Sequence, residues 1–221
     1  MLPQAENTPT YEETVVAKQQ LLSHLFSTNS IQLSPEGFVT KSGKKYYFET
    51  DVRAGITESN SAQEFAQLVY SLIERFLNEK TLLIGVPESG TLLSMLLYAE
   101  RLRHGQSGFP INLMRAIAKG YQPETAHTVL PIATAQEVVV LEDDVVTGST
   151  LLGYLQVLQQ IGLTKVTVVS IIDRNELTDG KSVGDRVREL GFAYQYLIGL
   201  DDILGYAKTQ GIIFPATESF K

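Results

Sequence analysis

Apolar residues recur at helical spacing in two stretches of the first third of the chain. Thr10 and Glu13 form a capping-box pattern before the first stretch, which predicts an amphipathic helix that ends near Asn29. Ser61 and Glu64 repeat this pattern before a second apolar face that runs from Phe65 to Phe76. Two amphipathic helices are therefore expected, and the polar residues 1–9, which include two prolines, are expected to form a loose tail.

The pattern changes to short β-type runs between the two helices. The runs 37–40 and 46–50 are joined by residues 41–45, a polar turn that contains glycine. This arrangement predicts a β-hairpin.

Continuous apolar runs alternate with helical stretches from Thr81 onward. The runs cover residues 81–86, 111–114, 137–141, 165–172 and 192–198. Apolar strands that alternate with helices are typical of a parallel sheet covered on both faces, so we expect an α/β fold. Ligands bind such sheets where strands end and helices begin, which directs attention to the loops 86–90, 115–128 and 142–150.

Composition narrows the class of protein. A chain of 221 residues with 43% hydrophobic content fits one domain spanning 1–221, in which residues 10–51 form a helix and hairpin and residues 61–200 the core. The net charge of −7 argues against binding to nucleic acid or to an anionic membrane. Cysteine is absent. The first residues have neither the basic start nor the apolar core expected of a signal peptide, and no apolar run is long enough to cross a bilayer. We therefore expect a cytoplasmic protein.

The segment from Val138 to Thr150 combines an apolar strand, two acids and a Thr-Gly-Ser-Thr run that enters a helix. Small residues at such a helix start let backbone N–H groups converge on a phosphate, and the helix N-terminus adds positive potential. Glu142 and Asp143 could accept hydrogen bonds from two neighbouring hydroxyls. Each feature alone is common in capped helices and solvated loops, but together they indicate a site for a ribose 5-phosphate unit.

This segment resembles the phosphoribosyl pyrophosphate (PRPP) signature of the type I phosphoribosyltransferases. The resemblance implies their fold, a mainly parallel central sheet flanked by helices with a small N-terminal hood. It also implies Mg²⁺ as cofactor. Glu142 and Asp143 would bind the ribose and contact the metal only indirectly, through ribose hydroxyls or water. The 5-phosphate would lie in a cradle formed by Val146, Thr147, Gly148, Ser149 and Thr150.

Three further segments are similar to parts of this family's site. The turn Glu88-Ser89-Gly90 follows an apolar strand, as the family's pyrophosphate loop does. Lys41 matches a phosphate-binding lysine in the hairpin turn. Arg115 and Lys119 match cations of a mobile catalytic loop that, in related enzymes, reaches across a homodimer interface. Catalysis would then be mainly electrostatic, with pyrophosphate leaving an oxocarbenium-like ribose.

The acceptor favoured by resemblance is orotate, which would give orotidine monophosphate and pyrophosphate. Tyr47 or Phe48 would stack near the base, and the guanidinium of Arg174 could grip the orotate carboxylate. The chain departs from the orotate pattern at four positions, which are Ser89, Ala116, Tyr121 and Val146. Transfer to another base and a non-catalytic PRPP sensor therefore stay open as alternatives, and a purely structural protein is the least favoured.

Overall fold

The computed structural model describes residues 11–39, 45–78, 80–105, 111–112, 137–160 and 162–212. Its centre is a five-stranded sheet in the order β4-β3-β5-β6-β7, in which every neighbouring pair is parallel. The strands are β3 (Thr81–Gly85), β4 (Ile111–Asn112), β5 (Glu137–Val145), β6 (Val166–Asp173) and β7 (Ala193–Gly199). The predicted parallel α/β sheet is confirmed.

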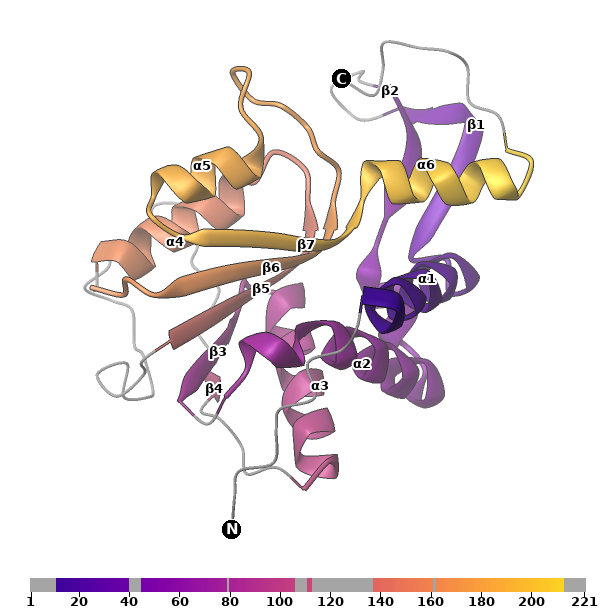
Figure 1. Cartoon of the computed structure of the whole chain (residues 1–221). Coiled ribbons are helices and arrows are strands. Elements are labelled where there is room, and N and C mark those ends of the chain that lie inside the picture. The colour runs from indigo at the N-terminus through magenta and orange to yellow at the C-terminus, as the bar shows by residue number, and fades with distance from the viewer. Residues whose placement is uncertain are drawn as a thin grey trace.

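Helices cover both faces of this sheet (Figure 1). One face packs against α1 (Tyr11–Ser27), α2 (Ser59–Ile73) and α3 (Ser89–Arg103), and the other against α4 (Ser149–Gln160) and α5 (Val183–Glu189). Successive strand residues supply the two faces, since Val139 and Leu141 belong to the first core and Val138 and Val140 to the second. Burial on both faces explains why the strands are continuously apolar.

A separate two-stranded sheet stands beside the carboxyl ends of the central strands (Figure 1). Its antiparallel strands are β1 (Ile31–Val39) and β2 (Lys45–Thr50), with a register shift between Leu33 and Phe38. Helix α6 (Leu200–Thr209) follows β7 directly and packs on α1, and Lys18 pairs with Asp202 at 2.8 Å. Two 3-10 turns, Val52–Ile56 and Glu74–Phe76, flank α2. The predicted hairpin is thus confirmed, although its first strand begins six residues earlier than expected.

Two sequence expectations need correction. Helix α2 begins at Ser59, so Ser61 lies inside the helix, where its hydroxyl donates to the Gly55 carbonyl at 2.6 Å instead of capping the helix. The sequence suggests that a loop begins after residue 141. Strand β5 instead continues to Val145, so Glu142, Asp143 and Asp144 lie in its final residues, where it still pairs with β6. Pairing of Glu142 with Ser170 and of Asp144 with Ile172 extends the strand. Among the described helices, none combines the length and apolar character needed to cross a bilayer.

Candidate functional site

Three consecutive acids, Glu142, Asp143 and Asp144, lie near the end of strand β5, just before its last residue, Val145. Glu142 is only 9% exposed, and its Oε2 atom has no hydrogen-bond partner within the described part of the chain. Burial, together with the charges of Asp143 and Asp144, raises the pKa of Glu142 to about 9. A buried carboxyl group without a donor is costly, which makes this atom a candidate acceptor for a ligand hydroxyl.

Asp143 connects this strand end to the loop between β3 and α3. Burial raises the pKa of Asp143, and a hydrogen bond from the Ser89 side chain acts in the opposite direction. Ser89 is the first residue of α3, so two loops predicted from the sequence meet here. The Val86 amide also donates to the Leu141 carbonyl at 2.8 Å.

The β3–α3 loop depends on two glycines. A Cβ atom on Gly85 would lie 2.0 Å from the Gly90 carbonyl oxygen, and one on Gly90 would lie 2.3 Å from the Leu141 carbonyl oxygen. Only residues without a side chain allow these backbones to approach so closely. The predicted pyrophosphate loop, Glu88 to Gly90, is therefore packed directly against strand β5.

Residues 146–150 form a tight connection between β5 and α4. Gly148 adopts a positive φ of 68°, and a Cβ atom there would lie 2.8 Å from the Cγ atoms of Val183. Arg186 supports the loop by donating to the Thr147 carbonyl at 3.1 Å. The loop leads into the N-terminus of α4 at Ser149, where unpaired amides favour an anion.

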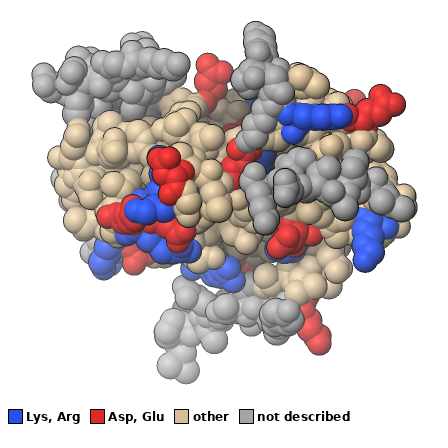
Figure 2. Space-filling view, turned by 90° about the horizontal axis from the view of Figure 1, so that it is seen from above, with Lys and Arg blue, Asp and Glu red and all other residues tan. Residues whose placement is uncertain are grey.

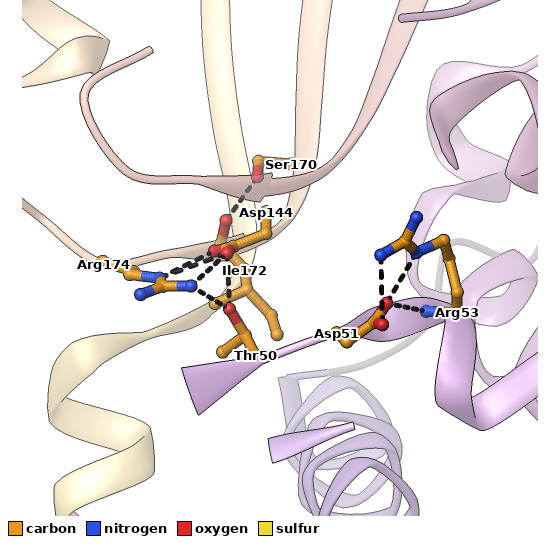
Figure 3. A network of polar contacts seen from close by, with 7 residues as sticks. All are labelled: Thr50, Asp51, Arg53, Asp144, Ser170, Ile172 and Arg174. Carbon is orange, nitrogen blue, oxygen red and sulfur yellow. Dashed lines mark hydrogen bonds and ion pairs between the residues drawn. The ribbon is translucent and has the colours of Figure 1, made fainter. Parts of the chain in front are cut away.

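A polar junction of Asp144, Arg174 and Thr50 joins the hairpin to the core (Figure 3). Arg174 donates from Nε and Nη2 to Asp144 Oδ2, at 3.1 and 2.6 Å, and Nη2 also donates to Thr50 Oγ1. The Thr50 hydroxyl in turn donates to Asp144. Both charged side chains are 13% exposed. Sequence reasoning selected Arg174 but missed Asp144, its partner.

A cavity of about 330 Å³ lies beside this junction. Phe48, Val146 and Arg174, all predicted site residues, line it together with residues of the hairpin and its neighbours, which are Asn29, Gln32, Tyr46, Glu49, Thr50 and Asp51. The Arg174 guanidinium lies 5.3 Å from the centre of the Phe48 ring. Tyr47 is buried and does not line the cavity, whereas Tyr46, which the sequence did not single out, does.

Arg53 is a further cation at this edge that sequence reasoning missed. Asp51 Oδ1 accepts a hydrogen bond from Arg53 Nε at 2.7 Å, and this contact lowers the pKa of Asp51 (Figure 3). Asp143 and Glu88 also act on Arg53 electrostatically. Figure 2 shows basic and acidic side chains intermixed on the face it presents, without a continuous basic patch among the described residues.

Several predicted site residues cannot be placed. Lys41, Arg115 and Lys119 lie outside the described residues, as do Ala116 and Tyr121. Within the described ranges, no group of three or more His, Asp or Glu side chains could hold a metal ion. The structure thus brings together Glu142, Asp143, the Glu88–Gly90 loop and the Val146–Thr150 loop, while the cations of the catalytic loop stay predictions.

Known proteins with a similar sequence and fold are phosphoribosyltransferases. A hypoxanthine/guanine phosphoribosyltransferase of Methanothermobacter thermautotrophicus is 28% identical over 202 residues, covering 83% of this chain and 93% of that protein. An orotate phosphoribosyltransferase of Thermococcus gammatolerans is 22% identical over 195 residues, covering 88% and 96%. The crystal structure of orotate phosphoribosyltransferase from Aeropyrum pernix superimposes with a TM-score of 0.64 at 21% identity, over 86% of this chain and 98% of that one.

The fold is that of the type I phosphoribosyltransferases. The resemblance read from residues 138–150 is therefore confirmed by both kinds of comparison. No protein-family model matches the sequence. The curated relatives carry different acceptor names, one oxopurine and one orotate, so likeness alone leaves the acceptor base open.

Proposed function

We propose that this protein transfers the phosphoribosyl group from PRPP to a nucleobase and releases pyrophosphate. The proposal rests mainly on Glu142, whose buried Oε2 atom has no hydrogen-bond donor among the described residues and lies just before the loop 146–150. A ribose hydroxyl would supply that donor. The relatives named above, all phosphoribosyltransferases, support the same reaction.

Different residues of the site would bind the ribose, the 5-phosphate and the pyrophosphate of PRPP. Glu142 and Asp143 orient the ribose hydroxyls and, as carboxylates once the bound ligand has displaced the proton of Glu142, favour positive charge on the sugar in the transition state. The amides and hydroxyls of residues 146–150, with the N-terminus of α4, receive the 5-phosphate. Backbone amides of residues 88–90 receive pyrophosphate, and by resemblance Lys41, Arg115 and Lys119 add positive charge.

Mg²⁺ fits this site as a cofactor bound largely through the substrate. The two carboxyl groups of Glu142 and Asp143 are hard oxygen ligands, and the described residues offer no third ligand beside them. The residues would thus contact the ion through ribose hydroxyls or water. When bound, Mg²⁺ would balance the charge of the pyrophosphate.

Orotate is one candidate acceptor, because two of the similar proteins named above are orotate phosphoribosyltransferases. The cavity lined by Phe48, Val146 and Arg174 is the place where either orotate or another base would lie. A hypoxanthine-type oxopurine is the other candidate that a relative supports. The cytoplasmic location inferred from the sequence remains part of the same proposal.

A homodimer is proposed from the exposed apolar stripe on α3. Leu92, Met95 and Leu102 are 45–49% exposed and follow one another at helical spacing. A second copy packing on this stripe would bury it. Light scattering should give a dimer mass for the wild type and a monomer mass for Met95→Glu, and a monomeric wild type would contradict the proposal.

Binding and turnover are tested separately. Mg²⁺ with PRPP should raise the melting temperature of the wild type. Glu142→Gln should weaken this shift, because Glu142 can release its proton to become a carboxylate when Mg²⁺ and PRPP bind, whereas glutamine cannot. Pyrophosphate release is then measured with each of a panel of bases. Binding of PRPP without release on any base would favour the PRPP sensor, and absence of binding would refute the proposal altogether.

Lys119→Ala probes the catalytic loop. Loss of one preorganised donor typically lowers the rate about a hundredfold to a thousandfold. The variant should lose turnover by this factor while its melting temperature without ligand stays that of the wild type. An unchanged rate would remove Lys119 from the mechanism.

A further inference from the structure

We infer that Asp144 makes the base cavity select an uncharged nucleobase and reject orotate. This inference rests on the proposed function, because it concerns the acceptor of that reaction. Its basis is the state of Arg174, which is the only cation among the described residues that line the cavity. The guanidinium that could bind an orotate carboxylate is already bound to a carboxylate of the protein itself.

The hydrogen bonds of Arg174 leave little capacity for a second carboxylate. Bidentate recognition uses two neighbouring nitrogens of the guanidinium, either Nε with Nη2 or Nη1 with Nη2. Nε and Nη2 both donate to Asp144, and Nη2 also donates to Thr50. Each fork therefore contains an engaged nitrogen. Within the described residues, Nη1 alone makes no hydrogen bond, so it can donate singly to a carbonyl oxygen of a base.

The charge near the cavity opposes an anionic base as well. Glu49, Asp51 and Arg174 line the cavity, Asp144 pairs with Arg174, and Arg53 pairs with Asp51. These side chains include three carboxyl groups and two guanidinium groups. An orotate carboxylate would lose its hydration beside an excess of negative charge. A neutral base loses less, because its carbonyl and ring N–H groups need only ordinary hydrogen bonds.

Arg174 is also held in place, so it cannot easily turn away from Asp144. Its amide donates to the Val145 carbonyl at 3.0 Å, at the end of β5. The preceding residue, Asp173, is buried and accepts a hydrogen bond from Tyr194 at 2.7 Å. The guanidinium further stacks on Phe48. Because these contacts keep Arg174 beside Asp144, its guanidinium is not available to bind the orotate carboxylate.

The test compares nucleotide products, because they bind without requiring turnover. Uridine and orotidine monophosphates differ only in the carboxylate on the base, and inosine monophosphate represents the oxopurines. By isothermal titration, the wild type should bind uridine or inosine monophosphate at least tenfold more tightly than orotidine monophosphate. Asp144→Asn should tighten orotidine monophosphate at least tenfold, about 1.4 kcal/mol, and change the uncharged nucleotides by less than about twofold.

Two further variants provide a second test of Arg174 and a charge-matched control. Thr50→Val releases Nη2 from one contact and should shift the same ratio in the same direction by a smaller factor, even if Asp144→Asn proves unstable. Glu36→Gln removes an equal charge from an exposed hairpin position that does not line the cavity, and it should leave the ratio unchanged.

The outcomes separate this inference from the proposed function. Tighter or equal binding of orotidine monophosphate by the wild type would overturn the inference, as would an unchanged ratio in both Asp144→Asn and Thr50→Val. Failure of all three nucleotides to bind a protein that is stabilised by PRPP would also overturn it, since the cavity would then not hold the base. Failure to bind PRPP would instead refute the proposed function.

Discussion

Replacing Glu142 by glutamine should remove a pH dependence of stability that this residue imposes. The pKa of Glu142 is about 9 in the folded protein, against an ordinary value of 4.5. Between these values the folded protein keeps a proton that the unfolded chain has released. The free energy of unfolding must therefore fall as the pH rises through this window, by at most about 1.4 kcal/mol per pH unit for one group.

Urea denaturation at pH 6, 7 and 8 measures this slope. Wild type and Glu142→Gln should diverge in favour of the variant by roughly 1 kcal/mol per unit, because glutamine cannot ionise and leaves other groups unchanged. Glu36→Gln, an exposed control, should follow the wild type. Parallel pH profiles for wild type and Glu142→Gln would show that Glu142 is not buried in the manner described, and would remove the main support for the ribose site.

Three other substitutions test local packing. Gly148→Ala should lower the free energy of unfolding by about 1–3 kcal/mol and weaken the PRPP-induced thermal shift. Adding Val183→Ala should restore part of the lost stability, because it removes the contact with the new methyl group. No recovery would mean that the positive φ alone causes the loss. Ser182→Ala, which removes the α5 capping box with Asp185, should cost about 1 kcal/mol in urea denaturation without altering PRPP binding, and a change in binding would place α5 in the site. Phe65→Ala should cost about 3–5 kcal/mol, and a loss below about 1 kcal/mol would contradict its burial in the core.

The central sheet was predictable because burial on both faces leaves continuous apolar runs in the sequence. The ends of the helices and the length of β5 were harder to predict from the sequence. The run 138–141 ends at Glu142, where the polar sequence suggests a loop, but backbone pairing with β6 carries the strand through all three acids. Helices α5 and α6 were not predicted either, because they span only 7 and 10 residues and so offer few turns over which apolar periodicity could be recognised.

Some residues of the candidate site could be predicted from the sequence and others could not. Glu142, Asp143 and the loop after them are contiguous in the sequence, so their chemistry could be recognised from one segment. Asp144 was passed over because its role depends on Arg174, 30 residues away, and on Thr50, 94 residues away. Tyr46 and Tyr47 are equally plausible aromatic residues in sequence, and only the strand orientation shows that Tyr46 lines the cavity. Contacts of this kind depend on the tertiary fold and leave no local pattern.

The close backbone approach at Gly85 and Gly90 limits how this protein can be evolved in the laboratory. Any side chain at either position collides with a main-chain carbonyl group, and main chain cannot move aside as a flexible side chain can. A mutant library aimed at a new acceptor should therefore keep both glycines fixed. Diversity is better placed at cavity residues such as Gln32, Tyr46 and Val146, whose side chains can vary without shifting the β3–α3 loop.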